Sequence, residues 1–210
     1  MDRLDTEKDL EMAVARLSAV EPRFGSIIER HGLPQLRHAE AGLESLLRIV
    51  TDQLISLKAG QAIWSRLATR FGDFVPADVL AASEEELRAL GLSGAKARTF
   101  RAAAHAFADG RLDVPLGRAD PDAMERRLLD IPGVGPWTAS IYQLMALRAP
   151  DAWPAADLAL QVAAWDLLGL TERPAARRMI ELAEPWRPCR STAALLLWQH
   201  YRGLKGMAPG

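Results

Sequence analysis

Cysteine is almost absent from this 210-residue sequence, which contains a single one, Cys189. One cysteine cannot form an intramolecular disulfide, and it cannot supply the four thiolates that hold an iron–sulfur cluster. The sequence therefore excludes both a disulfide-stabilised scaffold and an iron–sulfur cluster held by cysteines of this chain.

Long apolar runs and an excess of one charge are absent as well. No apolar run approaches the length of a membrane span, and the acidic segment Met1–Leu10 lacks the apolar core of a secretory signal. The 26 basic and 27 acidic residues give a formal net charge of -1, so charge balance gives no support for nucleic-acid binding. With 49% hydrophobic residues, the composition is that of a folded globular protein. We expect a cytoplasmic protein that makes no membrane contact.

Apolar residues recur at helical spacing along most of the chain, and no segment shows the sustained alternation of a strand. Three stripes are clear: Leu10, Val14 and Leu17; Leu43, Leu47, Val50, Leu54 and Leu57; and Leu158, Val162, Trp165 and Leu168. Residues typical of helix starts and ends are Ser83 with Glu86, Asp120 with Pro121, Gly91, Gly110, Thr171 and Ser191. The sequence therefore predicts an all-α fold.

The segment Leu128–Ala139, with the sequence LLDIPGVGPWTA, lies between two predicted helices. Pro132 has no amide hydrogen, and Gly133 and Gly135 allow backbone angles that side chains disfavour, so a helix cannot continue through this segment. The sequence predicts a helix, a tight hairpin and a second helix. Such a turn exposes backbone N–H groups at a helix N-terminus, which is a site for an anion such as a phosphate.

Four segments match, in order and spacing, a family of DNA repair enzymes. The first is the hairpin, and the others are Asp52–Ser56 (DQLIS), Asp151–Asp157 (DAWPAAD) and Trp186–Ser191 (WRPCRS). Together they resemble the AlkA-type 3-methyladenine DNA glycosylases of the helix-hairpin-helix (HhH-GPD) superfamily. The resemblance implies two helical lobes with the active cleft between them. Residues 39–110 would form a middle lobe, and residues 1–38 with 111–210 the lobe that carries the hairpin and the catalytic aspartate.

The resemblance implies a monofunctional DNA glycosylase that flips an alkylated base, of the 3-methyladenine or 7-methylguanine type, and hydrolyses its glycosidic bond. Asp157 matches the catalytic aspartate. A carboxylate there would stabilise the positive charge that the sugar gains as the base leaves, or orient the attacking water. Asp157 also begins a predicted helix, so capping is an alternative role and is compatible with catalysis. The competing acids are Asp130, Asp151 and Asp166, of which the last two are expected to be solvated.

The base pocket that the resemblance implies consists of Trp137, Trp198, Gln53 and Ile141. Trp137 stands where lyase-competent relatives carry a Schiff-base lysine, so covalent amine catalysis is not available at that position. Trp198 would stack on the flipped base, and an indole attracts a cationic purine by about 0.5–2 kcal/mol. Core packing is the alternative role of both tryptophans. Asp52 replaces a glycine that is common in the family, and Ile141 replaces a tyrosine.

The resemblance also implies contacts with double-stranded DNA that carries alkylated bases, bound by a monomer. The predicted DNA-binding residues are Gly133, Val134, Gly135, Thr138, Lys96 and Arg190, with Leu57 or a neighbour in Ile55–Ala59 as the apolar wedge that fills the gap left by the base. Backbone carbonyls of Leu129, Ile131 and Val134 would hold a monovalent cation, Na+ or K+, and no other cofactor is expected. Two alternatives stay open: a non-catalytic helix-hairpin-helix module that recognises damaged DNA, and a helical scaffold that binds other proteins.

Overall fold

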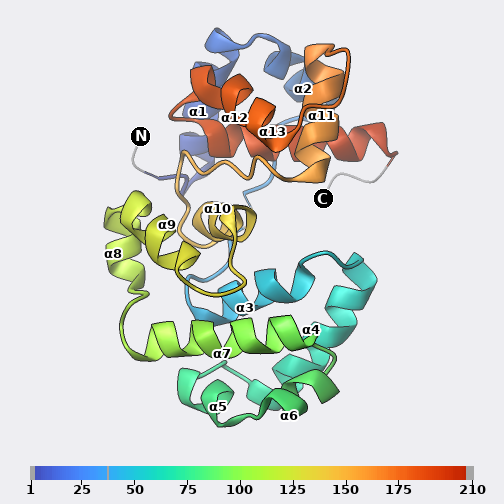
Figure 1. Ribbon diagram of the computed structural model, residues 1–210. Helices are drawn as coiled ribbons and strands as arrows, with labels where there is room; N and C mark the ends of the chain where they lie inside the picture. Colours follow the sequence, from blue (N-terminus) through green and yellow to red (C-terminus); the bar gives the residue numbers. More distant parts are fainter. Residues whose placement is uncertain (1–2, 37, 207–210) are drawn as a thin grey trace. The chain divides into compact units, whose positions relative to one another are not determined.

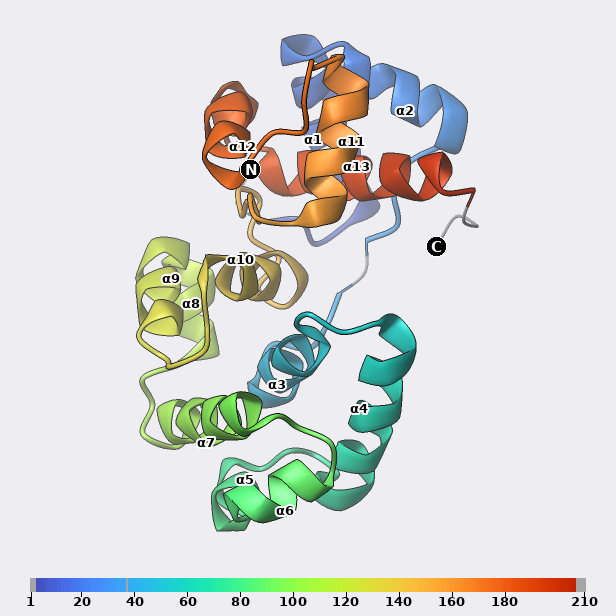
Figure 2. The same cartoon turned by 45° about the vertical axis from the view of Figure 1, so that its right-hand side comes forward.

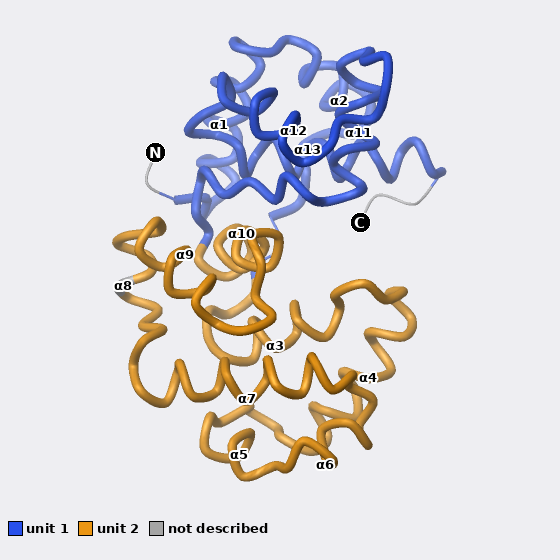
Figure 3. The backbone as a smooth tube through the Cα atoms, viewed as in Figure 1, with its two compact units in different colours: residues 1–38, 148–210 blue, residues 39–147 orange. Residues whose placement is uncertain are grey.

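The computed structural model describes residues 3–36 and 38–206, which form thirteen α-helices and one 3-10 helix (Figure 1). No strand occurs in these residues, and the predicted all-α fold is confirmed. Within the same ranges, no helix has both the length and the apolar character needed to cross a membrane. The chain divides into two compact units, residues 1–38 with 148–210 and residues 39–147 (Figure 3).

The first unit joins segments from both ends of the sequence. Its helices are α1 (Glu7–Val20), α2 (Arg23–His31), α11 (Leu158–Leu168), α12 (Ala176–Ala183), the 3-10 helix η1 (Glu184–Trp186) and α13 (Arg190–Leu204). α13 packs against α1, α2 and α11, so it is the central helix of this unit. The predicted stripe Leu10, Val14 and Leu17 on α1 is buried.

The second unit is continuous in sequence. Its helices are α3 (Leu43–Asp52), α4 (Leu57–Phe71), α5 (Pro76–Ala81), α6 (Glu84–Ala89), α7 (Gly94–Ala108), α8 (Val114–Ala119), α9 (Pro121–Leu129) and α10 (Pro136–Met145). α7 lies between α3 on one side and α5 and α6 on the other (Figures 1 and 2). Tyr142 on α10 is fully buried in the core of this unit, and burial raises the pKa of its hydroxyl to about 12.

The division between the units falls after Leu147, whereas the sequence predicts one after residue 110. Residues 111–147, which contain the hairpin, pack with the middle helices because α10 lies on α3 and α9 lies on α10. Ile131 and Val134 of the hairpin share one core with Leu46 and Leu47 of α3. The hairpin is therefore built into the 39–147 unit.

The stripe from Leu43 to Leu57 does not form one helix, and this part of the prediction is wrong. α3 ends at Asp52, and α4 begins at Leu57. Ser56 caps α4, since its hydroxyl accepts a hydrogen bond from the Ala59 N–H at 3.3 Å. Leu54, in the turn between the helices, has a φ of 56° and a fully exposed side chain. Apolar spacing alone cannot reveal that a helix has already ended.

Local capping signals were predictive where they stood next to a helix start. Ser83 and Asp120 cap α6 and α9 through their side chains, as predicted. Thr171 and Ser191 do not cap the last two helices, whose N-caps are Ala175 and Cys189. The stripe on α11 is wrong in part, because Leu158 and Trp165 are exposed while Leu160, Ala163 and Ala164 are buried.

Candidate active site and DNA-binding hairpin

Asp157 begins α11, and two donors meet on one oxygen of its carboxylate. Asp157 Oδ1 accepts a hydrogen bond from the Leu160 backbone N–H at 3.1 Å. The indole N–H of Trp198, on α13, donates to the same oxygen at 3.2 Å. Because α11 and α13 pack against each other, the carboxylate is held by its own helix and by a neighbour. Asp157 is thus the N-cap of α11, which was the alternative to a catalytic role. The capping bond holds its carboxylate in one orientation.

The loop that leads to Asp157 is held by several hydrogen bonds. Ser191 Oγ donates to the Ala149 carbonyl at 2.7 Å and accepts from the Ala152 N–H at 2.9 Å. The indole N–H of Trp153 donates to the Met179 carbonyl at 3.1 Å. The first turn of α13 and the helix α12 therefore fix the path of the loop, and Ser191 works here rather than as a helix cap.

Arg190 is not available to a phosphate in the way that the sequence predicts. Its guanidinium makes two bonds of 2.8 Å to the carboxylate of Asp151, and its side chain is only 12% exposed. Arg187 adds a third bond to Asp151, at 2.7 Å. Asp151 is therefore paired rather than solvated, which corrects the prediction for this acid. Asp166 is half-exposed and contacts His200 Nε2 at 2.7 Å.

The two hairpin glycines have different reasons to be glycine. Gly133 has a φ of 87°, and a methyl group on it would overlap with the hydroxyl of Thr99 on α7. Gly135 has an ordinary φ of -100°, and a methyl group on it would meet no atom within 4 Å. The prediction that both glycines are needed for unusual backbone angles is therefore right for Gly133 and wrong for Gly135. The absence of a side chain at Gly135 leaves open space beside the backbone, and its backbone angles are ones that any residue adopts.

The N-terminus of α10 follows directly on Gly135. This glycine is the N-cap and makes no side-chain cap bond, and Pro136 at the next position has no N–H to satisfy. The first-turn amides of α10 thus lie beside an open stretch of backbone, which is the arrangement expected of an anion site.

Gln53 and Thr138 join the end of α3 to the hairpin. The amide nitrogen Nε2 of Gln53 donates to Thr138 Oγ1 at 2.6 Å and to the Gly133 carbonyl at 3.4 Å. Thr138 is buried, so its hydroxyl serves this contact rather than a phosphate. On the same helix, Trp137 is half-buried and Ile141 is buried. The base pocket predicted from residues of both units stays a prediction.

Lys96 and Asp52 are also engaged within the 39–147 unit. The ammonium of Lys96 donates to the backbone carbonyls of Thr51 at 2.8 Å and Gln53 at 2.7 Å. Burial lowers the pKa of Lys96, and the nearby Asp52 carboxylate opposes this shift. Asp52 itself pairs with Arg48 at 2.8 Å. The ammonium of Lys96 is thus engaged by backbone carbonyls rather than by the phosphate that the sequence predicts.

Leu54 is a candidate functional residue that sequence reasoning missed. Its side chain is fully exposed, whereas Leu57, the predicted wedge, is 79% exposed and lies in the first turn of α4. Leu54 directly follows Gln53, whose amide is bonded to the hairpin. Ser56 is a residue typical of helix N-caps, so it could have indicated that a new helix begins there. Leu54 would then have been placed in a turn rather than in the buried stripe.

Three backbone carbonyls of the hairpin are the predicted ligands of a monovalent cation. In the described ranges, no backbone N–H donates to the carbonyl oxygens of Leu129 and Val134. The Ile131 carbonyl accepts one hydrogen bond, from the Val134 N–H at 3.0 Å, which leaves it a second lone pair. Neutral carbonyl oxygens are ligands that suit K+ and Na+. The donor set therefore fits the predicted ion.

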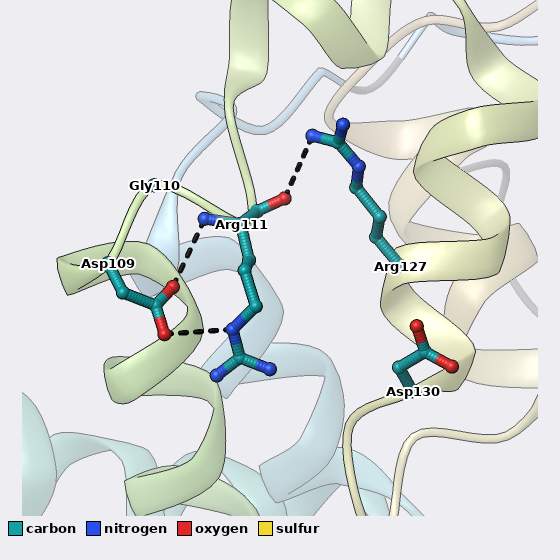
Figure 4. A pocket seen from close by; sticks show the side chains of 5 residues that line it. All are labelled: Asp109, Gly110, Arg111, Arg127 and Asp130. Carbon is teal, nitrogen blue, oxygen red and sulfur yellow. Dashed lines mark hydrogen bonds and ion pairs between the residues drawn. The ribbon is translucent and has the colours of Figure 1, made fainter.

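A pocket of about 310 Å³ lies near the start of the hairpin and is lined by charged groups (Figure 4). Its lining residues are Asp109, Gly110, Arg111, Arg127 and Asp130. Arg111 pairs with Asp109 at 2.8 Å, and Arg127 donates to the Arg111 carbonyl at 3.1 Å. No aromatic side chain lines this pocket, so it lacks the stacking surface that a flipped base requires. Asp130, a competing acid in the sequence, belongs to this charged group.

Comparisons with known proteins point to the same family as the motifs. Residues 47–188 match the model of the HhH-GPD superfamily base excision DNA repair protein. The probable bifunctional transcriptional activator/DNA repair enzyme AlkA of Mycobacterium tuberculosis is 33% identical over 208 residues, which cover 93% of this chain and 40% of that protein. The chain thus spans well under half the length of this relative. The alkylbase DNA glycosidase-like protein mag2 of Schizosaccharomyces pombe is 25% identical over 206 residues, 93% of this chain and 96% of that one.

A solved structure shows the same fold. The crystal structure of DNA-3-methyladenine glycosidase from Bacillus halodurans superposes with a TM-score of 0.80 and 28% identity, over 92% of this chain and 91% of that chain. The family model covers more than half of the sequence, including the hairpin and Asp157. The chain therefore belongs to the HhH-GPD superfamily of base excision DNA repair proteins.

Proposed function

We propose that this chain is a monofunctional DNA glycosylase that hydrolyses the N-glycosidic bond of alkylated bases, such as 3-methyladenine and 7-methylguanine. The observation that carries the proposal is the Asp157 carboxylate, oriented by the Leu160 N–H and the Trp198 indole N–H. The names of the similar proteins, a DNA repair enzyme AlkA and a DNA-3-methyladenine glycosidase, support the choice of substrate.

The proposed chemistry needs one carboxylate. As the base leaves, the sugar carbon gains positive charge, and a fixed carboxylate stabilises this charge or orients the attacking water. An alkylated purine already carries a positive charge, so it departs without a proton donor. Trp137 stands where a Schiff-base lysine would be needed for strand cleavage, which supports a hydrolase without lyase activity.

The hairpin is the proposed anchor for the DNA strand. The backbone at Gly135 carries no side chain, so a phosphate can approach the first-turn amides of α10. A Na+ or K+ ion on the carbonyls of Leu129, Ile131 and Val134 would offset the negative charge of that phosphate. Leu54 is proposed as the wedge in place of Leu57, because an apolar side chain that contacts nothing in its own unit is available to fill the space left by a flipped base.

Replacement of Asp157 by asparagine tests the catalytic assignment. Asparagine caps a helix as well as aspartate does, so Asp157→Asn should keep α11 and the fold intact. We expect release of 3-methyladenine from methylated duplex DNA to fall by at least about 100-fold, with binding to abasic duplex unchanged. Asp166→Asn, on the exposed face of the same helix, is the matched control and should retain the wild-type rate. Wild-type release by Asp157→Asn would refute the assignment.

The proposed partner is duplex DNA with alkylated bases, bound by a monomer in the cytoplasm. The alternative, a non-catalytic module for damaged DNA, predicts that the wild-type chain binds abasic duplex but releases no base. The same release assay therefore decides between the two functions. The base pocket of Trp137, Trp198, Gln53 and Ile141 is part of the proposal.

A further inference from the structure

Lys96 stands at the C-terminal end of α3, although it belongs to α7. Its ammonium bridges the carbonyl oxygens of Thr51 and Gln53, at 2.8 and 2.7 Å. The last carbonyls of a helix have no partner within the helix and carry partial negative charge, so a cation there is favourable. Lys96 thus closes the end of α3 at the residue that precedes Leu54.

The turn of residues 53–56 is fixed at both of its ends. On one side Lys96 holds the Gln53 carbonyl, while the Gln53 side chain is bonded to Thr138 and to the Gly133 carbonyl. On the other side Ser56 caps α4. Leu54 lies between these points with a left-handed φ, a conformation that persists only where the surrounding contacts impose it.

Asp52 completes the group around the turn. One of its oxygens pairs with Arg48, and the other is buried without a hydrogen-bond partner among the described residues. That second oxygen abuts Gly60 of α4 so closely that a methyl group on Gly60 would overlap with it. The half-buried carboxylate of Asp52 thus lies near the ammonium of Lys96, and its negative charge favours the charged form of the lysine.

We propose that Lys96 is a positioning residue, which holds the 53–56 turn against the hairpin so that Leu54 is presented to DNA as a rigid wedge. This inference rests on the proposed function, within which Leu54 is the wedge. It replaces the phosphate contact that the sequence predicts for Lys96, because the two short bonds of the ammonium go to backbone carbonyls, one in the last turn of α3 and one at Gln53. The Gln53 side-chain amide and the Lys96 ammonium would then keep the wedge in register with the hairpin that anchors the DNA strand.

The experiment measures base extrusion without base release. A duplex with 2-aminopurine as the target base gives a fluorescence increase when that base leaves the stack. We expect Lys96→Met to reduce the extruded fraction by about tenfold, since it removes the two charge-assisted hydrogen bonds that hold the end of α3 and the start of the turn. The salt dependence of duplex binding should stay as in the wild type, because no phosphate contact is lost. Lys96→Arg should restore most of the extrusion, and Arg88→Met, at an exposed position on α6, should match the wild type.

A double variant tests whether Lys96 acts through Leu54. If it does, Leu54→Ala with Lys96→Met should extrude no less than Leu54→Ala alone, because the turn then has no wedge to position. Additive losses would overturn the inference. So would a Lys96→Met variant with normal extrusion and a salt slope smaller by about one, which is the behaviour of a lost phosphate contact. If Lys96→Met fails to fold, Lys96→Gln is the second variant: its shorter, neutral side chain loses both charge-assisted bonds, so it should also lower the extruded fraction, and normal extrusion would overturn the inference.

The two proposals fail separately. Base release by the wild type and by Asp157→Asn reports on the glycosylase function, whereas the fluorescence of 2-aminopurine reports on the turn. Normal extrusion by Leu54→Ala would overturn the role of the wedge, and with it the role of Lys96, even in an active glycosylase.

Discussion

Leu54 has one feature that opposes folding and a second that adds nothing to stability. Its left-handed backbone costs a residue with a side chain about 1–2 kcal/mol, and its apolar side chain is fully exposed to water. Nothing in its own unit repays this cost through packing. Such a residue is expected where function, rather than stability, determines the side chain.

Leu54→Gly should therefore increase the stability of the protein while it impairs extrusion. Glycine adopts a left-handed φ without strain, and after its own entropy cost the free energy of unfolding should rise by about 0.5–1 kcal/mol. Denaturant unfolding measures this change. Leu57→Gly is the control, because glycine in the first turn of α4 should lower the free energy of unfolding. A lower stability of Leu54→Gly would contradict the account of strain.

Single residues show where sequence reasoning reached the site and where it did not. The position of Asp157 at a helix start could be predicted from the sequence, whereas its catalytic role stays a prediction. The bonds of Lys96 to the Thr51 and Gln53 carbonyls could not be predicted, and neither could those of Arg190 to Asp151. A long cationic side chain reaches whichever acceptor the fold brings near it, and its position in the sequence does not specify that acceptor.

At the scale of elements, the α9–α10 hairpin is tightly packed at one glycine and open to its surroundings at the other. Gly133 sits against Thr99 of α7, so the hairpin is locked to that helix. Gly135 lies beside the first turn of α10 with free space around it. The first glycine is required by the fold, whereas the second leaves the space that the proposed phosphate contact needs.

This difference predicts opposite effects of two alanine substitutions. Gly133→Ala should lower the free energy of unfolding by about 2–4 kcal/mol, from the left-handed backbone and the overlap with Thr99. Gly135→Ala should lower it by no more than about 1 kcal/mol, since alanine is a poorer N-cap than glycine, but weaken binding to abasic duplex by roughly tenfold. Denaturant unfolding and fluorescence anisotropy measure the two effects. If Gly135→Ala binds DNA as the wild type does, the proposed approach of the phosphate is wrong.

The existence of most elements could be predicted, but two of their features could not. Caps beside a helix start, such as Ser83 and Asp120, marked the boundaries correctly. The break between α3 and α4 could not be predicted from apolar spacing, because Leu54 and Leu57 continue the spacing of α3. Which face of α11 is buried also depends on its packing against α13, a contact between segments far apart in the sequence.

At the scale of the whole molecule, one unit is continuous and the other is not. Residues 39–147 contain a complete core, whereas the first unit needs helices from both ends of the sequence. The all-α class and the family could be predicted from periodicity and motifs. The division after Leu147 could not, because it depends on the contact of α10 with α3.

A fragment of residues 39–147 should therefore fold alone. We expect a helical circular dichroism spectrum and one cooperative unfolding transition, since its core is formed entirely within the fragment. A fragment of residues 148–210 should show neither, because α1 and α2 cover α13 in the intact unit. A 39–147 fragment without a cooperative transition would contradict this division.

The discontinuous unit has a consequence for synthesis on the ribosome. α1 and α2 emerge before the 39–147 unit, but α13, against which they pack, is translated only after that entire unit. At elongation rates of about 5–20 residues per second, this interval lasts roughly 10–30 seconds. During that time the apolar faces around Leu10, Leu17 and Phe24 have no partner in the nascent chain, and they are the segments on which a chaperone would act.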